Sequence, residues 1–536
     1  MKKILLISFL LTALVAKSQV VDRYNFIQRP TETGVTIAWR TATAGVGTLN
    51  WGLDAFNLTN TETNATATKK HAFDLTGLEP NTQYFYQTTT DNGNISAIDF
   101  FYTAKSDTTR SLSFLHYGDC GYNNSIQSDI AELMIGDSTE FGIVAGDVDQ
   151  GDGDNYDEVF FGPYTDLLKN SCQFTCIGNH DTYADNAATY IDAFYLPTNN
   201  PQQTERYYSF TWGNAKFVCL DSNIPYTIGT DQHNWMLDEL KCNDRQWLFV
   251  FFHHPPWTNA WSFDYYIPFT PYYQYQGNED MRTDLVPYFE TYNVDFVLNG
   301  HSHCYQRGEL NGVKYIISGG AGSSTIDANK TDDAPNIDTE IYTNQYVRFD
   351  VSGDTATYVS IDINDNVIDS VTTIKQFVNI KPVISQNGNT LESTAASSYV
   401  WFLDGIQING ATAQTYTPTQ SGIYEVMTTN QNGCDFSSTT YNFDLITKVE
   451  NNLGLSNLNL YPNPAREYIQ IAGKLNNNSS LIITIYNTLG EVLISNQITT
   501  LGAFNHQIDL SSLTAGIYFL SATNGLDKVV KKIIKE

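Results

Sequence analysis

The stretch FTCIGNHD, residues 174–181, places an apolar run directly before a glycine and three polar side chains. The apolar run FTCI predicts a short buried strand. The amide, imidazole and carboxylate that follow are then carried on a loop at the end of a sheet, where a rigid strand can hold reactive groups. Asn and His are also ordinary residues at strand ends, so this stretch indicates a site only if other parts of the chain supply partners.

Four more apolar runs within residues 111–374 end in the same way. They lead into YGDCG at 117–121, AGDV at 145–148, HHPP at 253–256 and GHSH at 300–303. Helical patterns at 126–135 and 156–168 alternate with the predicted strands, which indicates a layered α/β domain. Because ligands of such domains bind beyond the carboxyl ends of the strands, we expect the five motifs to meet at one edge.

The side chains of these motifs form a mixed oxygen and nitrogen ligand set. Carboxylates, an amide oxygen and imidazoles suit zinc, iron or manganese rather than a thiolate site. There are enough ligands for two ions bridged by one carboxylate. Two such ions, roughly 3.5–4 Å apart, clamp an in-line displacement at phosphorus and lower the pKa of a shared water, which then attacks as hydroxide.

The order of the five motifs resembles that of the calcineurin-like metallophosphatases, and the nearest branch looks like the purple acid phosphatases. Three features carry the second likeness: Gly-Asp-x-Gly at 118–121, the run HCYQR at 303–307, and a fibronectin-like segment before the α/β domain. The resemblance covers roughly residues 20 to 372. It implies an αββα sandwich and a secreted, acid phosphatase-like enzyme that hydrolyses small phosphomonoesters with two divalent or trivalent ions (Fe, Zn or Mn).

The resemblance also assigns metal ligands by position in the motifs. Asp119 and His303 would bind the first metal, and Asp147 would bridge both metals. The second metal would be bound by Asn179, His253 and His301.

Three further residues receive roles from the resemblance or from their position. His180 would be the catalytic residue that orients the phosphate and protonates the leaving alkoxide as a general acid. His254, next to His253, is either a substrate-binding residue or a packing residue. Arg307 could meet a phosphate oxygen or brace its loop, and we favour the brace.

One position departs from the pattern of the resembled families. Purple enzymes carry a tyrosinate ligand three residues after the bridging Asp, and here that position is Gln150. The wider superfamily supplies a histidine two residues after the first Asp, where this chain has Gly121. Asp149, Gln150 or water would have to fill the gap at the first metal, and we predict that the protein is not purple.

The net charge restricts the classes of partner, and the spacing of the cysteines restricts the possible disulfides. The formal net charge of -29 argues against nucleic acid and anionic membranes as partners. There are seven cysteines, and Cys172 and Cys176 lie too far apart along one strand for a bridge. We expect most of the cysteines to be buried thiols.

The ends of the chain predict export. Residues 1–18 have a basic start, an apolar run and small residues at the end, as in a secretory signal peptide, and no later run is long enough for a transmembrane helix. Residues 456–536 resemble the C-terminal sorting domain of type IX secretion substrates. This resemblance implies the type IX secretion machinery as a partner, with export through the periplasm and outer membrane to a secreted or cell-surface location.

The predicted architecture has four folded parts. Residues 19–104 read as a fibronectin type III-like β-sandwich with Tyr84 in a tyrosine corner. The metallophosphatase domain spans 108–372. Residues 378–446 resemble the immunoglobulin-like modules of Bacteroidetes surface proteins, and residues 456–536 form the β-sandwich sorting domain.

Three functions remain open on the sequence alone. A phosphodiesterase or nucleotide hydrolase would use the same motifs as a phosphomonoesterase, so only the pocket walls separate these two. An aromatic loop, residues 257–275, either walls the pocket or packs on itself. A surface binding protein with a degenerate metal site is the third alternative, because the first metal lacks its usual extra ligand.

Overall fold

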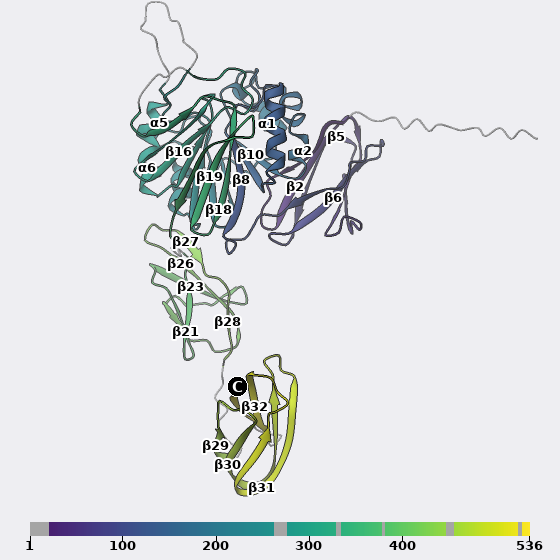
Figure 1. The fold of residues 1–536 in the computed structure, drawn as a ribbon, viewed down its shortest axis with the longest axis vertical. Helices are drawn as coiled ribbons and strands as arrows, with labels where there is room; N and C mark the ends of the chain where they lie inside the picture. Colours follow the sequence, from purple (N-terminus) through teal and green to yellow (C-terminus); the bar gives the residue numbers. More distant parts are fainter. Residues whose placement is uncertain (1–20, 262–275, 329–333, 378–380, 446–454, 524–527) are drawn as a thin grey trace, which may run out of the picture.

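A computed structural model of the chain describes residues 21–261, 276–328, 334–377, 381–445, 455–523 and 528–536. The predicted signal peptide lies outside these residues. Figure 1 shows a central α/β domain with a β domain at its side and two more β domains following one another below it. Within the described residues no helix is long and apolar enough to cross a membrane.

The N-terminal β domain consists of two sheets, of strand order β1-β2-β5 and β4-β3-β6-β7. Its strands are β1 (Val21–Gln28), β2 (Gly34–Gly45), β3 (Gly47–Gly52), β4 (Asn60–Thr63), β5 (Thr68–Thr76), β6 (Gln83–Thr90) and β7 (Asp99–Tyr102). Tyr84 is buried, and its hydroxyl accepts a hydrogen bond from the Glu79 N–H at 3.0 Å, as a tyrosine corner requires. Arg23 ties this domain to the next by pairing with Asp157 at 2.5 Å and donating to the Ala193 carbonyl at 2.6 Å.

The α/β domain is built on two sheets packed face to face, of order β10-β9-β8-β18-β19-β20 and β11-β12-β13-β14-β16-β15-β17. The first sheet contains β8 (Ser111–Tyr117), β9 (Phe141–Val144), β10 (Cys172–Thr175), β18 (Gln345–Ser352), β19 (Thr355–Asp362) and β20 (Val367–Ile374). The second contains β11 (Tyr208–Trp212), β12 (Ala215–Cys219), β13 (Trp247–Phe251), β14 (Phe296–Asn299), β15 (Tyr305–Leu310), β16 (Val313–Ser318) and β17 (Ile337–Ile341).

Aromatic side chains fill the space between these sheets. Phe114 of β8 stacks on Phe349 of β18 at 4.6 Å and meets Phe217 and Phe249 of the other sheet edge-on at 5.2 and 5.3 Å. All four are fully buried. Because each aromatic side chain buries a large apolar area, this layer fixes the two sheets against each other and so fixes the strand ends that carry the site.

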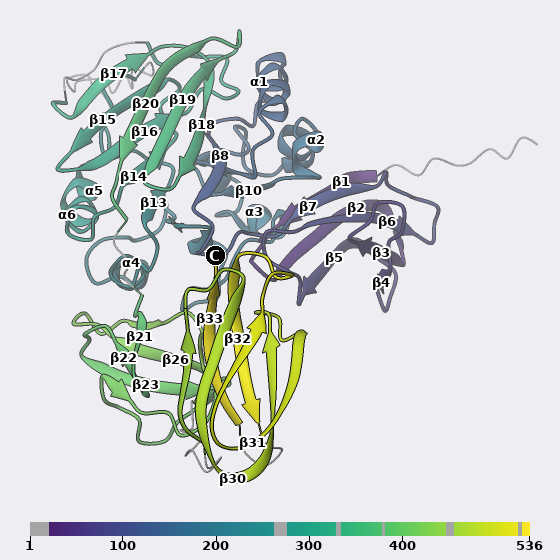
Figure 2. The same cartoon turned by 60° about the horizontal axis from the view of Figure 1, so that its bottom comes forward.

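Helices cover the outer faces of the two sheets (Figures 1 and 2). They are α1 (Ser125–Gly136), α2 (Thr165–Leu168), α3 (Ala188–Ala193), α4 (Asp231–Lys241), α5 (Glu279–Asp284) and α6 (Val286–Thr291). Helices α4 to α6 share a second core with the far face of the β12–β14 sheet, which includes Val218, Val250 and Val297. The layers therefore follow the predicted αββα order.

One of the two helices predicted in this domain is confirmed and the other is wrong. The helix expected over 126–135 is confirmed as α1. The single helix expected over 156–168 is wrong, because a π turn at Asp157–Phe161 is followed by the separate short helix α2. Pro163 lies between them, and a proline has no N–H to continue the helical ladder.

Two β domains complete the chain. Residues 381–445 form sheets β21-β22-β25 and β24-β23-β26-β27, with β28 on β26, around the buried Trp401. The strands are β21 (Ile384–Asn387), β22 (Thr390–Ser393), β23 (Ser398–Leu403), β24 (Ile406–Gln407), β25 (Thr415–Tyr416), β26 (Gly422–Thr429), β27 (Asp435–Ser437) and β28 (Tyr441–Phe443). The last domain contains β29 (Leu455–Tyr461), β30 (Tyr468–Tyr486), β31 (Val492–Asp509), β32 (Gly516–Thr523) and β33 (Lys528–Lys535).

The cysteines follow the prediction with one exception. Five are buried free thiols, as expected for most of them: Cys120, Cys172, Cys176, Cys219 and Cys304. The remaining two, Cys242 and Cys434, form a disulfide across 192 residues, which the sequence reasoning did not find. No spacing rule could have found it, because the two residues belong to different domains.

Candidate metal centre

The five motifs meet at one edge of the α/β domain because each follows the carboxyl end of a strand. The strands in question are β8, β9, β10, β13 and β14. The backbone bends sharply where several of these strands end. Asp119, Asp147 and His301 have φ values of 55°, 48° and 69°, in the left-handed region that only a minority of non-glycine residues adopt. Such conformations are costly and concentrate at functional sites.

Glycines let the motifs approach one another. A Cβ at Gly178 would lie 2.0 Å from Asp147 Oδ1, and a Cβ at Gly300 would lie 2.6 Å from Asp119 Oδ2. Both distances are shorter than any real contact, so these positions accept no side chain without moving a carboxylate. Gly178 and Gly300 therefore serve the packing of the site as well as its turns.

His253 lies at the centre of one half of the site. Its Nδ1 donates to the Ala145 carbonyl at 2.8 Å, which leaves Nε2 to face the cluster. Around Nε2 lie Asn179 Oδ1 at 3.0 Å, His301 Nδ1 at 3.1 Å and Asp147 Oδ2 at 3.3 Å. This ring nitrogen thus faces other acceptor atoms, an arrangement that needs a cation or a proton between them.

His303 repeats this arrangement in the other half. Its Nδ1 contacts the Thr325 carbonyl at 3.2 Å and the Ser323 hydroxyl at 2.9 Å. Its Nε2 lies 3.4 Å from Asp119 Oδ1. Metal-binding histidines are commonly oriented by such a bond from the second ring nitrogen, so both halves fit a metal ligand set.

The charges agree with this fit. Burial on its own would lower the pKa of His253, but the Asp147 and Asp119 carboxylates raise it to about 9. Burial and the neighbouring histidines lower the pKa of His301, so this ring stays neutral and can offer a nitrogen lone pair to a cation. The two carboxylates therefore favour a positive charge at the point where they meet His253, as the ligands of a cation do.

Gln150 lies between the two carboxylates. Its Nε2 is 3.3 Å from Asp119 Oδ1 and 3.3 Å from Asp147 Oδ2. The amide can turn its oxygen to the same place, because the two ends of a glutamine amide have the same shape. Asp149 is used differently. Its carboxylate accepts hydrogen bonds from the backbone N–H groups of residues 151, 154 and 155 at 2.7, 3.0 and 2.9 Å, so it holds the loop together.

His180 stands beside this cluster on a single 3-10 turn, His180–Thr182. Its backbone N–H donates to Asp147 Oδ1 at 2.9 Å, and its ring Nδ1 donates to the Gly151 carbonyl at 3.0 Å. The ring lies against Tyr183, with ring centres 4.7 Å apart. The backbone N–H of His180 thus orients the Asp147 carboxylate. Because Nδ1 is used in the bond to Gly151, Nε2 is the ring nitrogen that could give or take a proton.

Asp181 has a structural role that the sequence reasoning missed. Its buried carboxylate accepts from the N–H groups of Gly178 and Asp149 at 2.8 and 3.1 Å and from the Tyr156 hydroxyl at 3.0 Å. It therefore ties the loop after β9 to the loop after β10. The residue was visible as the last member of the opening stretch, but two of its partners, Asp149 and Tyr156, come from the segment after β9.

His254 and Trp261 both lie against His301. His254 Nδ1 lies 2.8 Å from the Ser222 hydroxyl, and the His254 ring centre lies 4.5 Å from that of His301. Trp261 of the aromatic loop also lies over His301, with ring centres 4.9 Å apart. This contact favours a pocket wall at the start of that loop, and residues 262–275 lie outside the described residues. Arg307 pairs with Asp369 of β20 at 2.5 Å, which supports the brace.

Comparison with known proteins identifies the class. Residues 112–305 match the calcineurin-like phosphoesterases, residues 24–103 match the purple acid phosphatase N-terminal domain, and residues 459–536 match the secretion system C-terminal sorting domain. The chain thus carries a calcineurin-like phosphoesterase domain between a purple acid phosphatase N-terminal domain and a sorting domain. The sorting domain indicates export to a secreted or cell-surface location.

The similar curated proteins are purple acid phosphatases. Purple acid phosphatase 15 of Arabidopsis thaliana is 27% identical over 302 residues, 47% of this chain and 53% of the relative. The Glycine max enzyme is 33% identical over 136 residues, 24% of this chain and 27% of the relative. The chain thus spans about half or less of the length of these relatives.

Solved structures show the same fold. A purple acid phosphatase from yellow lupin (Lupinus luteus) seeds matches 67% of this chain and 76% of its own, with a TM-score of 0.56 and 17% identity. PhoD matches 71% of this chain and 93% of its own, with a TM-score of 0.52 and 13% identity.

Proposed function

We propose that this protein is a secreted metal-dependent phosphatase that hydrolyses phosphomonoesters at a dinuclear centre. The observation that carries the proposal is the environment of His253 Nε2, which faces Asn179 Oδ1, Asp147 Oδ2 and His301 Nδ1 within 3.3 Å. Buried acceptor atoms converge in this way where a cation is to be bound. Homologous purple acid phosphatases support the same class of chemistry.

In this proposal the predicted ligands hold two ions. Asp119 and His303 bind the first ion, Asn179, His253 and His301 bind the second, and Asp147 bridges them. Bound ions of this kind would act as Lewis acids on the phosphate and lower the pKa of a water, which would then attack phosphorus as hydroxide.

Gln150 completes the first site in this proposal. It contacts both carboxylates at 3.3 Å, and turning its amide presents an oxygen ligand at the same place. The proposal gives Asp149 no such role, because its carboxylate already accepts three backbone hydrogen bonds. A neutral amide replaces a tyrosinate here, so the first site carries one negative charge fewer than that of the resembled enzymes.

The remaining residues act on the substrate. His180, held at Nδ1 by the Gly151 carbonyl, presents Nε2 to protonate the leaving oxygen. Ser222 fixes His254 in the same manner, which places a second imidazole beside His301 to contact a phosphate oxygen. Trp261 covers this side of the centre and packs against the organic part of the ester.

The test uses the full chain stripped of metal. Zn, Fe, Mn, Co and Mg are added back singly and in pairs, and hydrolysis of p-nitrophenyl phosphate and bis-p-nitrophenyl phosphate is followed. We expect metal-dependent cleavage of the monoester, and a loss of more than about 100-fold in kcat/KM for Asn179→Ala, because loss of a ligand exceeds loss of the residues that support it. Asn234→Ala, at an exposed position of α4, is the matched control.

Two outcomes would replace the proposal. Cleavage of the diester alone would assign a phosphodiesterase. If the folded protein hydrolyses neither substrate with any of the metals, a binding protein with a degenerate centre would be favoured.

A further inference from the structure

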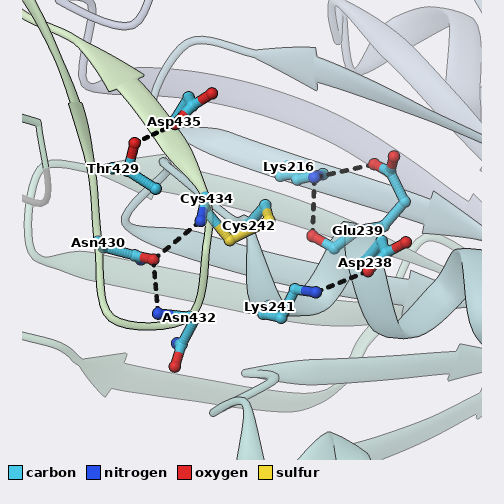
Figure 3. The surroundings of a disulfide bond; sticks show 10 residues. All are labelled: Lys216, Asp238, Glu239, Lys241, Cys242, Thr429, Asn430, Asn432, Cys434 and Asp435. Carbon is cyan, nitrogen blue, oxygen red and sulfur yellow. Dashed lines mark hydrogen bonds and ion pairs between the residues drawn. A yellow bond between two sulfur atoms is a disulfide. The ribbon is translucent and has the colours of Figure 1, made fainter. Parts of the chain in front are cut away.

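A disulfide joins the phosphoesterase domain to the β domain of residues 381–445. Cys242 is the C-cap residue of α4, and Cys434 lies in the turn between β26 and β27 (Figure 3). Their Cα atoms are 5.3 Å apart, although 192 residues separate them in the sequence. The bond is therefore a cross-link between two domains, and neither domain needs it to close its own sheets.

Both ends of this cross-link are held by side chains of their own domain. In the turn, Asn430 Oδ1 accepts from the N–H groups of Asn432 and Cys434 at 2.8 and 3.0 Å. On the other side, Lys216 of β12 pairs with the Glu239 carboxylate of α4 at 2.9 Å and donates to the Glu239 carbonyl at 2.8 Å (Figure 3). The two sulfur atoms are thus carried on fixed segments, so the bond fixes one domain relative to the other.

Beyond the disulfide, the two domains are joined by ion pairs and border an open cleft. Lys381 of the β domain forms ion pairs with Asp107 and with Asp244, the second at 3.1 Å. Beside the disulfide lies a cleft of about 660 Å³, lined by residues of both domains that include Lys241, Tyr292 and Asn430. Interfaces between domains of one chain usually permit relative motion, so the covalent bond adds a restraint that these contacts alone do not supply.

Cys242 of the cross-link and His253 of the metal centre lie on either side of strand β13 in the sequence. Cys242 lies five residues before the start of β13 at Trp247, whereas His253 follows the end of the same strand. The disulfide and the metal centre therefore lie at opposite ends of the sheet. In Figure 1 the β domain of residues 381–445 and the sorting domain lie below the α/β domain.

We propose that residues 381–445 are a rigid spacer, locked to the phosphoesterase domain by the Cys242–Cys434 disulfide, which holds the mouth of the metal centre away from the C-terminal domain. In an exported protein this arrangement keeps the centre open to solvent while the other end engages the secretion machinery or a surface. The inference does not depend on the reaction that the centre catalyses.

The lock forms by oxidation after export. The two thiols lose two electrons and two protons to a disulfide of a thiol–disulfide oxidoreductase, which is reduced to a dithiol as the S–S bond forms. Selectivity follows from position, because Cys242 and Cys434 meet across the domain boundary, whereas the other five cysteines are buried free thiols. Oxidising compartments are where such bonds persist.

The first experiment tests the bond itself on the full chain produced by export. Free thiols are alkylated under denaturing conditions without reductant, and the protein is digested and analysed by mass spectrometry. We expect one linked peptide pair containing Cys242 and Cys434, with the other five cysteines alkylated. Alkylation of Cys242 and Cys434 in the exported protein would overturn the proposal.

The second experiment tests the rigid spacer by small-angle X-ray scattering. Cys434→Ser, or the reduced parent protein if the variant does not fold, is expected to show a larger radius of gyration than the oxidised parent. Asn432→Ser in the same turn keeps both sulfur atoms and should match the parent. An identical scattering profile with and without the disulfide would overturn the spacer, since the other contacts would then suffice.

Discussion

Gln150 distinguishes this centre from those of the enzymes it resembles. The side chain reaches both carboxylates at 3.3 Å, and in the proposed centre it would take the place of the tyrosinate without supplying its charge or its colour. We expect the wild-type protein loaded with ferric iron to lack a visible charge-transfer band, and Gln150→Tyr to gain one. Absorption spectra of the iron-loaded proteins, with bound iron measured on the same samples, give the answer without an activity assay.

Gln150→Phe is the matched control for this experiment. It introduces the same ring without the oxygen that binds iron, so it should remain colourless. A visible band in the wild type, or a colourless Gln150→Tyr that holds the same amount of iron, would contradict the role proposed for this position.

The sequence predicted which residues gather at the centre but not how all of them are used. The motif order was sufficient for Asp147, Asn179 and His253, because parallel strands bring their carboxyl ends to one edge. It could not separate Asp149 from Gln150, since the difference lies in three backbone N–H groups that fold around Asp149. The role of Asp181 was hidden for the same reason, as Asp149 and Tyr156 reach it from the segment after β9.

At the scale of elements, apolar runs predicted the strands better than periodicity predicted the helices. The runs before the five motifs correspond to strands that pair in the two sheets of the central domain. The helix expected over 156–168 failed at Pro163, where a local covalent constraint overrides the apolar pattern. The sequence pattern also held no signal for the link between α4 and the β26–β27 turn, because that contact depends on how two domains dock.

The connection between α3 and β11 carries a carboxyl group that should make stability depend on pH. Burial raises the pKa of Glu205 to about 7, and Oε2 has no hydrogen-bond partner in the part of the chain that the structure describes. The folded state therefore favours the protonated form. Its stabilising effect is complete below the pKa of the unfolded chain, near 4.5, and is lost as the pH rises through about 7.

Glu205→Gln should remove this dependence, because the amide stays neutral at every pH. We expect the variant to gain about 2–3 kcal/mol over the wild type at pH 8 and little at pH 4, measured by urea unfolding at the two pH values. Glu132→Gln, at an exposed position of α1, should leave the pH profile unchanged. Equal gains at both pH values would show that packing, and not ionisation, is responsible.

At the scale of the whole molecule, the order of domains was readable from the sequence and their docking was not. The N-terminal, phosphoesterase and sorting domains agree with the matches at 24–103, 112–305 and 459–536. Residues 381–445 form a two-sheet β domain, and their immunoglobulin-like classification stays a prediction. Seven cysteines with no paired spacing gave no reason to choose Cys242 and Cys434, because the pairing follows from the docking of two domains.

The cross-link should contribute to the stability of the two domains it joins as one unit. In the chain-entropy model, closing a loop of this length stabilises the folded state by about 5 kcal/mol. Cys242→Ser and Cys434→Ser each remove the whole bond, so each variant and the double variant should lose a similar amount in denaturant unfolding under oxidising conditions. The reduced parent should unfold with the variants.

The test is whether the stability losses of the two single variants add up in the double variant. Residues that contribute separately through packing give losses that add, whereas the two halves of one bond give a double variant no worse than either single variant. Cys172→Ser, a buried free thiol of β10, should instead add its own loss to that of Cys434→Ser. Additive losses for Cys242 and Cys434 would mean that the two sulfur atoms act as separate buried groups, and the domains would then be held only by the ion pairs of Lys381 and the contacts around the cleft.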